Sequence, residues 1–123
     1  MTLDTNIIIG YLKEERPIFE ALSQWRQEGR HFILPTIVEA EVLSFSPLTP
    51  QEQLRIETFL RENFLSVSFD RAVAKIAASI RREQKIKFPD AAIAATALYT
   101  HTPLVTRNVK DFQRVKGLRV VSL

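Results

Sequence analysis

The sequence predicts an α/β fold in which helices cover a parallel β-sheet. Short runs of apolar and β-branched residues alternate with longer segments of helical periodicity from one end of the chain to the other. The 123 residues are 46% hydrophobic and 25% charged, which is an ordinary composition for a globular domain. No linker, repeat or low-complexity tract divides the sequence. We therefore expect a single domain over residues 1–123 with one core.

Strand and helix signals follow one another closely at the start of the chain. Residues 2–4 are predicted to form the first strand, and the helix after it begins at Thr5 or Asn6. A second helix covers residues 17–29, because proline suits the first turn of a helix and glycine suits its end. The apolar residues 31–34 are then predicted to form the second strand.

Two helices and a third strand are predicted for the middle of the chain. The first helix covers residues 35–45. The second begins after Thr49, which is suited to cap it, and Pro50 then occupies the first helical position. Glu52 follows the cap at the spacing of a capping box. Residues 65–69 alternate apolar side chains with serine, which is typical of a strand.

The last part of the chain completes the alternation of helices and strands. Asp70 is predicted to cap a long helix that ends in the basic run RREQK. The helix over residues 88–101 is apolar on nearly every side, which indicates a position in the centre of the protein. Residues 103–106 and 119–123 form the last two strands, with a short amphipathic segment over residues 109–115 between them.

The composition limits the classes of function. Cysteine is absent, which excludes disulfides, thiol catalysis and thiolate metal sites. No apolar run reaches the roughly 20 residues that span a bilayer, and no signal-peptide pattern opens the chain, so we expect a cytoplasmic protein without a membrane partner. The net charge of +3 and the pI near 9.5 weakly favour a polyanionic partner. The basic residues gather late, at Arg81, Arg82, Lys85 and Lys87, and at Arg107, Lys110, Arg114, Lys116 and Arg119. A solvated helix face explains either group as well as an RNA-binding surface does.

Acidic residues from separated segments are predicted to meet at one edge of the sheet. The functional crevice of a parallel α/β sheet lies outside the carboxyl ends of its strands. Asp4 ends the first strand, and Glu41 lies in the helix after the second. Asp90 opens the helix before the fourth strand, and Asp111 follows that strand closely. These positions place all four carboxylates at the same end of the sheet.

Each carboxylate also has a simpler explanation. Asp4 can cap the helix that follows it, and Asp90 can interact with a helix dipole from the first turn. Asp111 can pair with a basic neighbour at the surface. Helical spacing leaves open whether Glu41 or Glu39 faces the apolar side of its helix. The convergence of four acids is what favours a functional site over these separate roles.

Such a group of like charges would destabilise the fold unless a cation neutralised it. Oxygen ligands without cysteine favour a hard divalent ion, so we expect Mg²⁺ or Mn²⁺ rather than Zn²⁺. His31 and His101 have no partner at ligand spacing and are expected to be ordinary core or surface residues. A divalent ion in an acidic pocket can bind water and a phosphodiester together, while surrounding Lys and Arg hold neighbouring phosphates. The pattern predicts a nuclease.

Four segments carry a resemblance to a known family: LDTNIIIGYL, PTIVEAEVL, FPDAAIAATAL and LVTRNVKDFQRVKGLRVV. Together they resemble the PIN-domain family, and within it the VapC-type toxins of bacterial toxin-antitoxin pairs. The resemblance spans essentially the whole chain, with the motifs in order. It implies a three-layer sandwich around a parallel sheet of about five strands, Mg²⁺-dependent endoribonuclease activity in which Mn²⁺ can substitute, and a homodimer.

The resemblance also implies roles for particular residues. The catalytic acids are Asp4, Glu41, Asp90 and Asp111, of which Asp4 and Asp90 are metal ligands. Asn108 competes with Asp111 for the fourth position, and we assign Asp111 as the acid and Asn108 as a polar helper. The other supporting polar residues are Thr5 and Asn6, which would position water or metal, and Thr106, which would hydrogen-bond a carboxylate of the pocket. Arg107 and Lys110 are expected to bind RNA.

Three functions fit this reading of the sequence. The first is a ribonuclease toxin that a VapB-like antitoxin restrains, with residues 45–64 as a candidate dimer or antitoxin surface; core packing explains the apolar side chains of that segment equally well. The second is a housekeeping PIN nuclease that processes RNA without an antitoxin. The third is a catalytically silent PIN module that binds RNA or protein.

Overall fold

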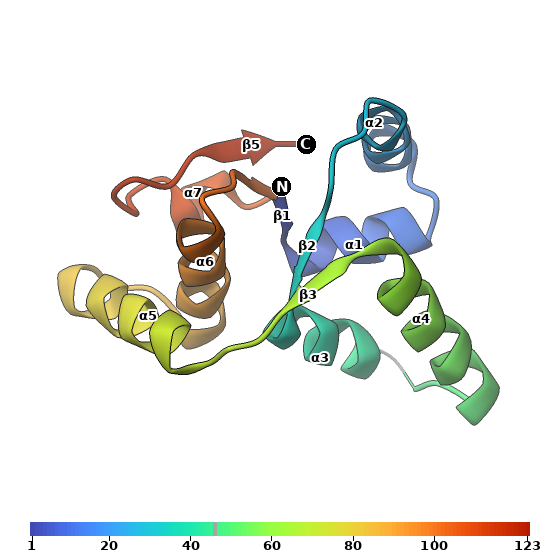
Figure 1. The fold of residues 1–123 in the computed structure, drawn as a ribbon, viewed down its shortest axis with the longest axis horizontal. Coiled ribbons are helices and arrows are strands. Elements are labelled where there is room, and N and C mark those ends of the chain that lie inside the picture. The colour runs from blue at the N-terminus through green and yellow to red at the C-terminus, as the bar shows by residue number, and fades with distance from the viewer. Residues whose placement is uncertain (46) are drawn as a thin grey trace.

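The computed structural model describes residues 1–45 and 47–123, and it confirms the predicted α/β class. Five parallel strands form one sheet in the order β3-β2-β1-β4-β5 (Figure 1). The central strand pairs Thr2 with Ile33 on one side and Leu3 with Val105 on the other. The strands are β1 (Thr2–Leu3), β2 (Ile33–Pro35), β3 (Leu65–Val67), β4 (Leu104–Thr106) and β5 (Val120–Ser122).

Helices cover both sides of the sheet, so the described part of the chain is a three-layer sandwich. In Figure 1, α5, α6 and α7 lie on one side of the central strands, and α1, α2 and α4 lie on the other. The helices are α1 (Thr5–Leu12), α2 (Arg16–Gln27), α3 (Thr36–Ser44), α4 (Pro50–Asn63), α5 (Arg71–Glu83), α6 (Phe88–Thr100) and α7 (Val109–Phe112). None of the helices in residues 1–45 and 47–123 has the length and apolar character needed to cross a membrane.

The predicted helix starts are confirmed by their capping contacts. The Thr49 hydroxyl accepts from the Glu52 backbone N–H, and the Glu52 carboxylate accepts from the Thr49 N–H, both at 3.1 Å. This is the predicted capping box of α4. The Asp70 carboxylate accepts from the Val73 N–H at 3.0 Å and so caps α5. Satisfying these N–H groups stabilises each helix by about 1 kcal/mol.

Several predicted boundaries were wrong by a few residues. The second strand begins and ends later than predicted, at Ile33–Pro35. The third strand ends at Val67, because the Phe69 N–H binds the Thr36 hydroxyl at 3.2 Å instead of extending the ladder. The helix predicted to reach residue 29 ends at Gln27, and Gly29 adopts φ +82° in the turn after it.

Helix α6 lies in the centre of the protein, as its composition predicted. Seven consecutive residues, 91–97, are buried, five of which are alanine. The small side chains let α6 pack closely against α5 and against the sheet. His31 and His101 are both exposed, which confirms that neither belongs to a buried site. Because residues 91–97 are buried, packing fixes the position of the helix whose first turn carries Asp90.

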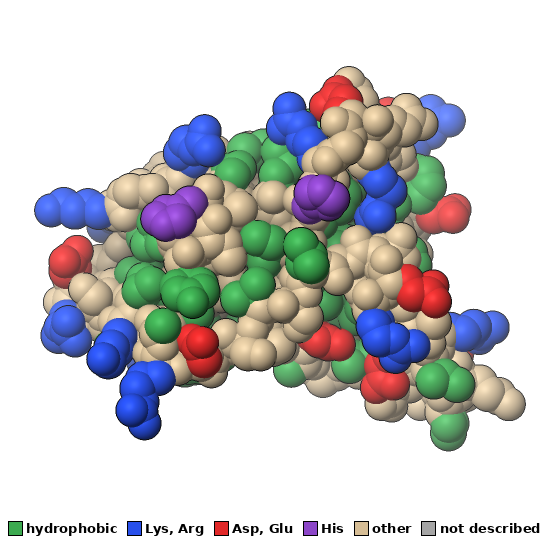
Figure 2. Space-filling view, in the orientation of Figure 1, with side chains coloured by type: hydrophobic (Ala, Val, Ile, Leu, Met, Phe, Trp, Pro, Cys, Tyr) green, Lys and Arg blue, Asp and Glu red, His purple; other side chains and the backbone are tan. Residues whose placement is uncertain are grey.

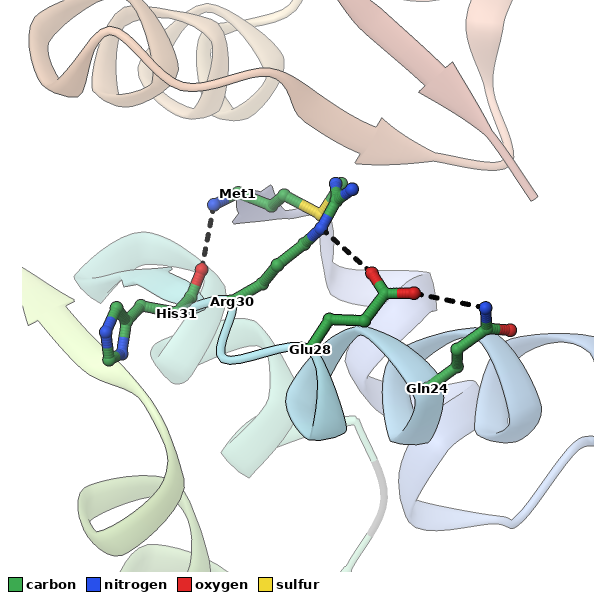
Figure 3. A network of polar contacts seen from close by, with 5 residues as sticks. All are labelled: Met1, Gln24, Glu28, Arg30 and His31. Carbon is green, nitrogen blue, oxygen red and sulfur yellow. Dashed lines mark hydrogen bonds and ion pairs between the residues drawn. The ribbon is translucent and has the colours of Figure 1, made fainter.

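The amino end of the sheet carries a network of paired polar groups (Figure 3). The Met1 amino group donates to the His31 backbone oxygen at 2.9 Å. Arg30 and Glu28 form an ion pair of 3.3 Å, and Gln24 donates to the other Glu28 oxygen at 3.1 Å. Each charge in this network has a partner.

Candidate active site

Asp4 lies at the carboxyl end of β1, and only 5% of its surface is exposed. One carboxylate oxygen accepts from the Thr5 backbone N–H at 2.8 Å, which confirms the prediction that Asp4 can cap the helix that follows it, α1. The other oxygen accepts from the Thr106 hydroxyl at 2.6 Å. The register of β1 with β4 brings Thr106 there, since Leu3 pairs with Val105. The predicted hydrogen bond between Thr106 and a carboxylate is confirmed.

Glu41 reaches the same end of the sheet from α3. Its carboxylate accepts from the Thr5 hydroxyl at 2.6 Å, so the residue next to Asp4 holds a second acid. Glu39 instead lines a different cavity, with Leu34 and Leu60. The structure thereby decides which of the two glutamates faces Asp4, a choice that helical spacing left open. Thr5 binds this acid directly, and its role in positioning water or metal, which the family resemblance implied, stays a prediction.

Asp90 and Asp111 line one cleft of about 660 Å³. Asp90 lies in the first turn of α6 and is half-buried, whereas Asp111 lies in α7 and is exposed. Asp111 forms no ion pair with any of the residues that the structure describes, so the pairing offered as its simpler explanation is absent there. Lys110, a predicted RNA-binding residue, lines the same cleft.

The four acids, Asp4, Glu41, Asp90 and Asp111, influence one another electrostatically, and we call them the acid cluster. Burial, and after it the negative charges of the other three acids, raises the pKa of Asp90 to about 6 against the opposing effect of Lys87. Burial also raises the pKa of Asp4; hydrogen bonds from Thr106 and Thr5 oppose the increase, whereas Glu41 and Asp111 add to it. Among residues 1–45 and 47–123, no ion pair neutralises any member of the cluster.

The remaining predicted site residues lie around this cluster with different contacts. The Asn108 backbone N–H donates to the Thr106 hydroxyl at 2.9 Å, so Asn108 supports the residue that supports Asp4. Asn6 follows in the first turn of α1, and its side-chain oxygen is buried without a hydrogen-bond partner. Arg107 forms an ion pair with Glu15. Nothing in the sequence pattern pointed to Glu15, which lies 92 residues from Arg107 along the chain.

The carboxylate and amide oxygens of the site suit a hard cation that needs only one or two ligands from the protein. No three His, Asp or Glu side chains in the described part of the chain stand close enough to hold one ion among them. Mg²⁺ nevertheless commonly keeps several waters and uses only one or two carboxylates. The unneutralised oxygens of the acid cluster and the unpaired buried oxygen of Asn6 are ligands of the kind that it prefers. The residues present therefore fit Mg²⁺ or Mn²⁺.

Comparisons with known proteins agree with this architecture. Ribonuclease VapC1 from Rickettsia felis is 29% identical over 133 residues, an alignment that covers 100% of this chain and 96% of that protein. A chain of a toxin-antitoxin complex from Klebsiella pneumoniae is 30% identical, with a TM-score of 0.82 and coverage of 98% of this chain and 95% of that chain.

The fold is also shared with VapBC2 from Rickettsia felis, solved bound to a DNA fragment from its promoter. That structure has a TM-score of 0.84 at 24% identity and covers 99% of this chain and 97% of its own. The family model described as PIN domain matches residues 1–118, which is nearly the whole chain. The protein whose acids converge at the carboxyl end of this five-stranded sheet therefore belongs to the PIN domain family.

Proposed function

We propose that the protein is a Mg²⁺-dependent endoribonuclease that hydrolyses RNA phosphodiester bonds and acts as the toxin of a VapBC-type pair. The observation that carries the proposal is the acid cluster: burial and the charges of neighbouring carboxylates raise the pKa of Asp4 and Asp90, and no ion pair within residues 1–45 and 47–123 neutralises them. A fold that keeps such a group at the carboxyl ends of its strands gains from it only when a cation binds. The name of the Rickettsia felis relative, a ribonuclease, supports the choice of substrate.

Asp4 and Asp90 are the proposed metal ligands. Burial and neighbouring carboxylates raise the pKa of both residues, so both gain from a bound cation. Mg²⁺, or Mn²⁺ in its place, would lower the pKa of bound water and stabilise the charge that develops on the phosphate.

The other residues of the site hold the acids in place, position the attacking water, accept its proton or contact the RNA. Thr106 holds Asp4 from the side of β4, the Asn108 backbone N–H holds Thr106 in turn, and Thr5 holds Glu41 from the side of α1. Glu41 and Asp111 remain to orient the attacking water and to accept its proton. Arg107 and Lys110 flank this edge of the sheet, where they would contact the RNA backbone.

A protein antitoxin and a second copy of the chain are the proposed partners. The Klebsiella pneumoniae structure is a toxin-antitoxin complex, which supports an antitoxin for this chain as well. Phe45 and Leu54 expose 56% and 61% of their surface. Large apolar side chains of this exposure are common at protein interfaces, so the segment that contains them is the proposed contact surface.

The proposal is tested by RNA cleavage with the full chain. We expect cleavage of a structured RNA with Mg²⁺ or Mn²⁺, none in EDTA, and none by the Asp4→Asn variant, which should still bind the RNA. Asp70→Asn is the matched control, because Asp70 is an exposed helix cap in α5. Cleavage by Asp4→Asn or in EDTA would contradict the mechanism, and binding without cleavage by the unchanged protein would identify a silent binding module.

A second measurement separates a toxin from a housekeeping nuclease. Expression of a toxin should arrest growth, and co-expression of a short DNA-binding protein encoded next to it should restore growth. Growth that continues during expression of a cleavage-competent protein would favour the housekeeping function instead.

A further inference from the structure

A strongly basic cleft opens beside the acid cluster. It is the cleft of about 660 Å³ that Asp90 and Asp111 line, and its walls come from the end of α5, the loop before α6, and α7. Figure 2 shows Lys and Arg side chains projecting from the end of the molecule that α5 forms. The cations that line the cleft, and that define the basic cleft below, are Arg81, Lys85, Lys87, Lys110 and Arg114.

Within residues 1–45 and 47–123, none of these five cations forms an ion pair, although the Asp90 and Asp111 carboxylates share the cleft and Lys87 interacts with Asp90. In residues 1–45 and 47–123, the ion pairs are Arg107 with Glu15 and Arg30 with Glu28, and both lie outside the cleft. The Arg81 side chain is nevertheless fixed in place, since its Nε donates to the Ile86 backbone oxygen at 3.2 Å. Five cations against two carboxylates leave a formal excess of three positive charges on one concave surface, and a bound polyanion relieves the repulsion among the cations.

The lining of the cleft selects phosphates rather than bases. No aromatic side chain is among the described residues that line it, so the cleft offers no platform on which a base can stack. Its uncharged polar lining consists of Gln84 and Gln113. Lys and Arg bind backbone phosphates without reading sequence.

We propose that the basic cleft holds the phosphate backbone of the RNA strand on one side of the cleavage site. The inference rests on the proposed function, because it places the scissile phosphate at the acid cluster. Asp90 and Asp111 belong both to that cluster and to the wall of the cleft, so a strand that leaves the acids along this wall enters the cleft directly. The cleft thus supplies affinity for the strand and no preference for its sequence.

The first test measures RNA binding with the Lys85→Gln/Arg114→Gln double variant in the full chain. The double variant and the parent protein with which it is compared both carry Asp4→Asn, so that the RNA stays intact. Loss of two phosphate contacts should reduce the slope of log K against log salt concentration by about 1.4, or about 0.7 per contact with a single strand. Arg81 and Lys87 are left unchanged, because Arg81 holds the loop and Lys87 acts on the pKa of Asp90.

The matched control is Arg71→Gln/Lys75→Gln, which removes the same charge from exposed positions of α5 outside the cleft. We expect its salt slope to equal that of the parent protein. An equal fall of the slope in both double variants would mean that the cleft acts only through net charge, and an unchanged slope in Lys85→Gln/Arg114→Gln would mean that no phosphate binds there. Either result overturns the inference.

The second test uses cleavage by the double variant with Asp4 restored. KM should rise for an RNA long enough to cross the cleft and stay unchanged for an oligonucleotide too short to reach it, with the same kcat for both. An equal rise for both lengths would overturn the inference. Failure of the proposed function has a different signature, since a protein that lacks nuclease activity would cleave neither RNA while the salt slope still fell.

Discussion

Charged groups are arranged differently at the two ends of the sheet. At the amino end, the Met1 amino group has the His31 carbonyl as its partner, and Arg30 pairs with Glu28 (Figure 3). At the carboxyl end, the acid cluster gathers four negative charges, and burial together with mutual repulsion raises the pKa of Asp4 and Asp90. Paired groups therefore predominate where the strands begin, although partial burial and the Arg30 charge lower the pKa of the Met1 amino group, whereas several like charges gather where the strands end.

This difference separates residues that serve the fold from residues that serve chemistry. Exposed pairs such as Arg30 with Glu28 contribute little and cost little. Buried like charges cost stability, and their presence is explained by a ligand that binds the folded state. Several like charges gathered in one place are thus a better guide to function than a single perturbed group such as the Met1 amino group.

The largest effect is expected from Asp90→Asn. The amide cannot supply the charge of a metal-binding carboxylate. Changing a residue that only supports a metal ligand typically lowers activity by up to about 100-fold, so loss of the ligand itself should lower RNA cleavage by more than that. The measurement is kcat/KM with saturating Mg²⁺, and Asp70→Asn is again the control. Activity within a few-fold of the unchanged protein would remove Asp90 from the metal site.

A smaller effect is expected from Thr106→Val, which keeps the volume but removes the donor to Asp4. Because that hydrogen bond lowers the pKa of Asp4, its loss should move the acidic limb of the pH–rate profile to higher pH. Activity should fall by about 10- to 100-fold. Thr106→Ser, which restores the hydroxyl, should recover both the activity and the position of the acidic limb. If Thr106→Val loses activity without moving the pH–rate profile, the role of Thr106 is purely structural.

The stability of the metal-free protein should fall as pH rises from about 4 to about 6. The folded protein binds more protons than the unfolded chain in this interval, since the pKa of Asp90 rises from 3.8 to about 6 on folding. Asp90 is partly exposed and screened by solvent, so we expect a decrease of about 1 kcal/mol in the free energy of unfolding. Urea unfolding in EDTA measures it.

Asp90→Asn serves as the comparison in the same unfolding experiment. The variant should lose part of the pH dependence and be more stable than the unchanged protein near neutral pH. Identical pH profiles for the two proteins would show that Asp90 carries no penalty in the fold. Addition of Mg²⁺ should raise the stability of the unchanged protein more than that of the variant.

The smallest effect is expected at the opposite end of the sheet. Arg30→Gln breaks the pair with Glu28, in which both side chains are about half exposed. The free energy of unfolding should change by about 0.5 kcal/mol or less, and cleavage should not change. A loss of activity in this variant would contradict the separation of the two ends, because it would connect the amino end to the chemistry.

Local signals in the sequence predicted most of the fold. The capping residues Thr49 and Asp70 marked helix starts, and the apolar helix that begins at Phe88 marked the centre. Strand ends were harder to predict, because the third strand ends where the Phe69 N–H turns to the Thr36 hydroxyl. That contact depends on tertiary structure and leaves no periodic signal.

The candidate site could be predicted where residues adjoin strand ends. Asp4 and Thr106 follow paired residues of neighbouring strands, so topology alone brings them together. The choice of Glu41 over Glu39 needed either the family resemblance or the structure, because both lie on α3 among apolar neighbours. The pair of Arg107 with Glu15 joins two loops, and no local pattern specifies such a contact.

The hydrogen bond from Thr106 to Asp4 joins residues 102 positions apart. Contacts of such long range form only after the intervening chain is available to close the loop. During translation, the carboxylate at the end of β1 cannot receive this partner until the chain has been made as far as β4. A nascent chain that stops short of residue 106 consequently lacks the hydrogen bond that lowers the pKa of Asp4, even though β1 and α1 have already been made.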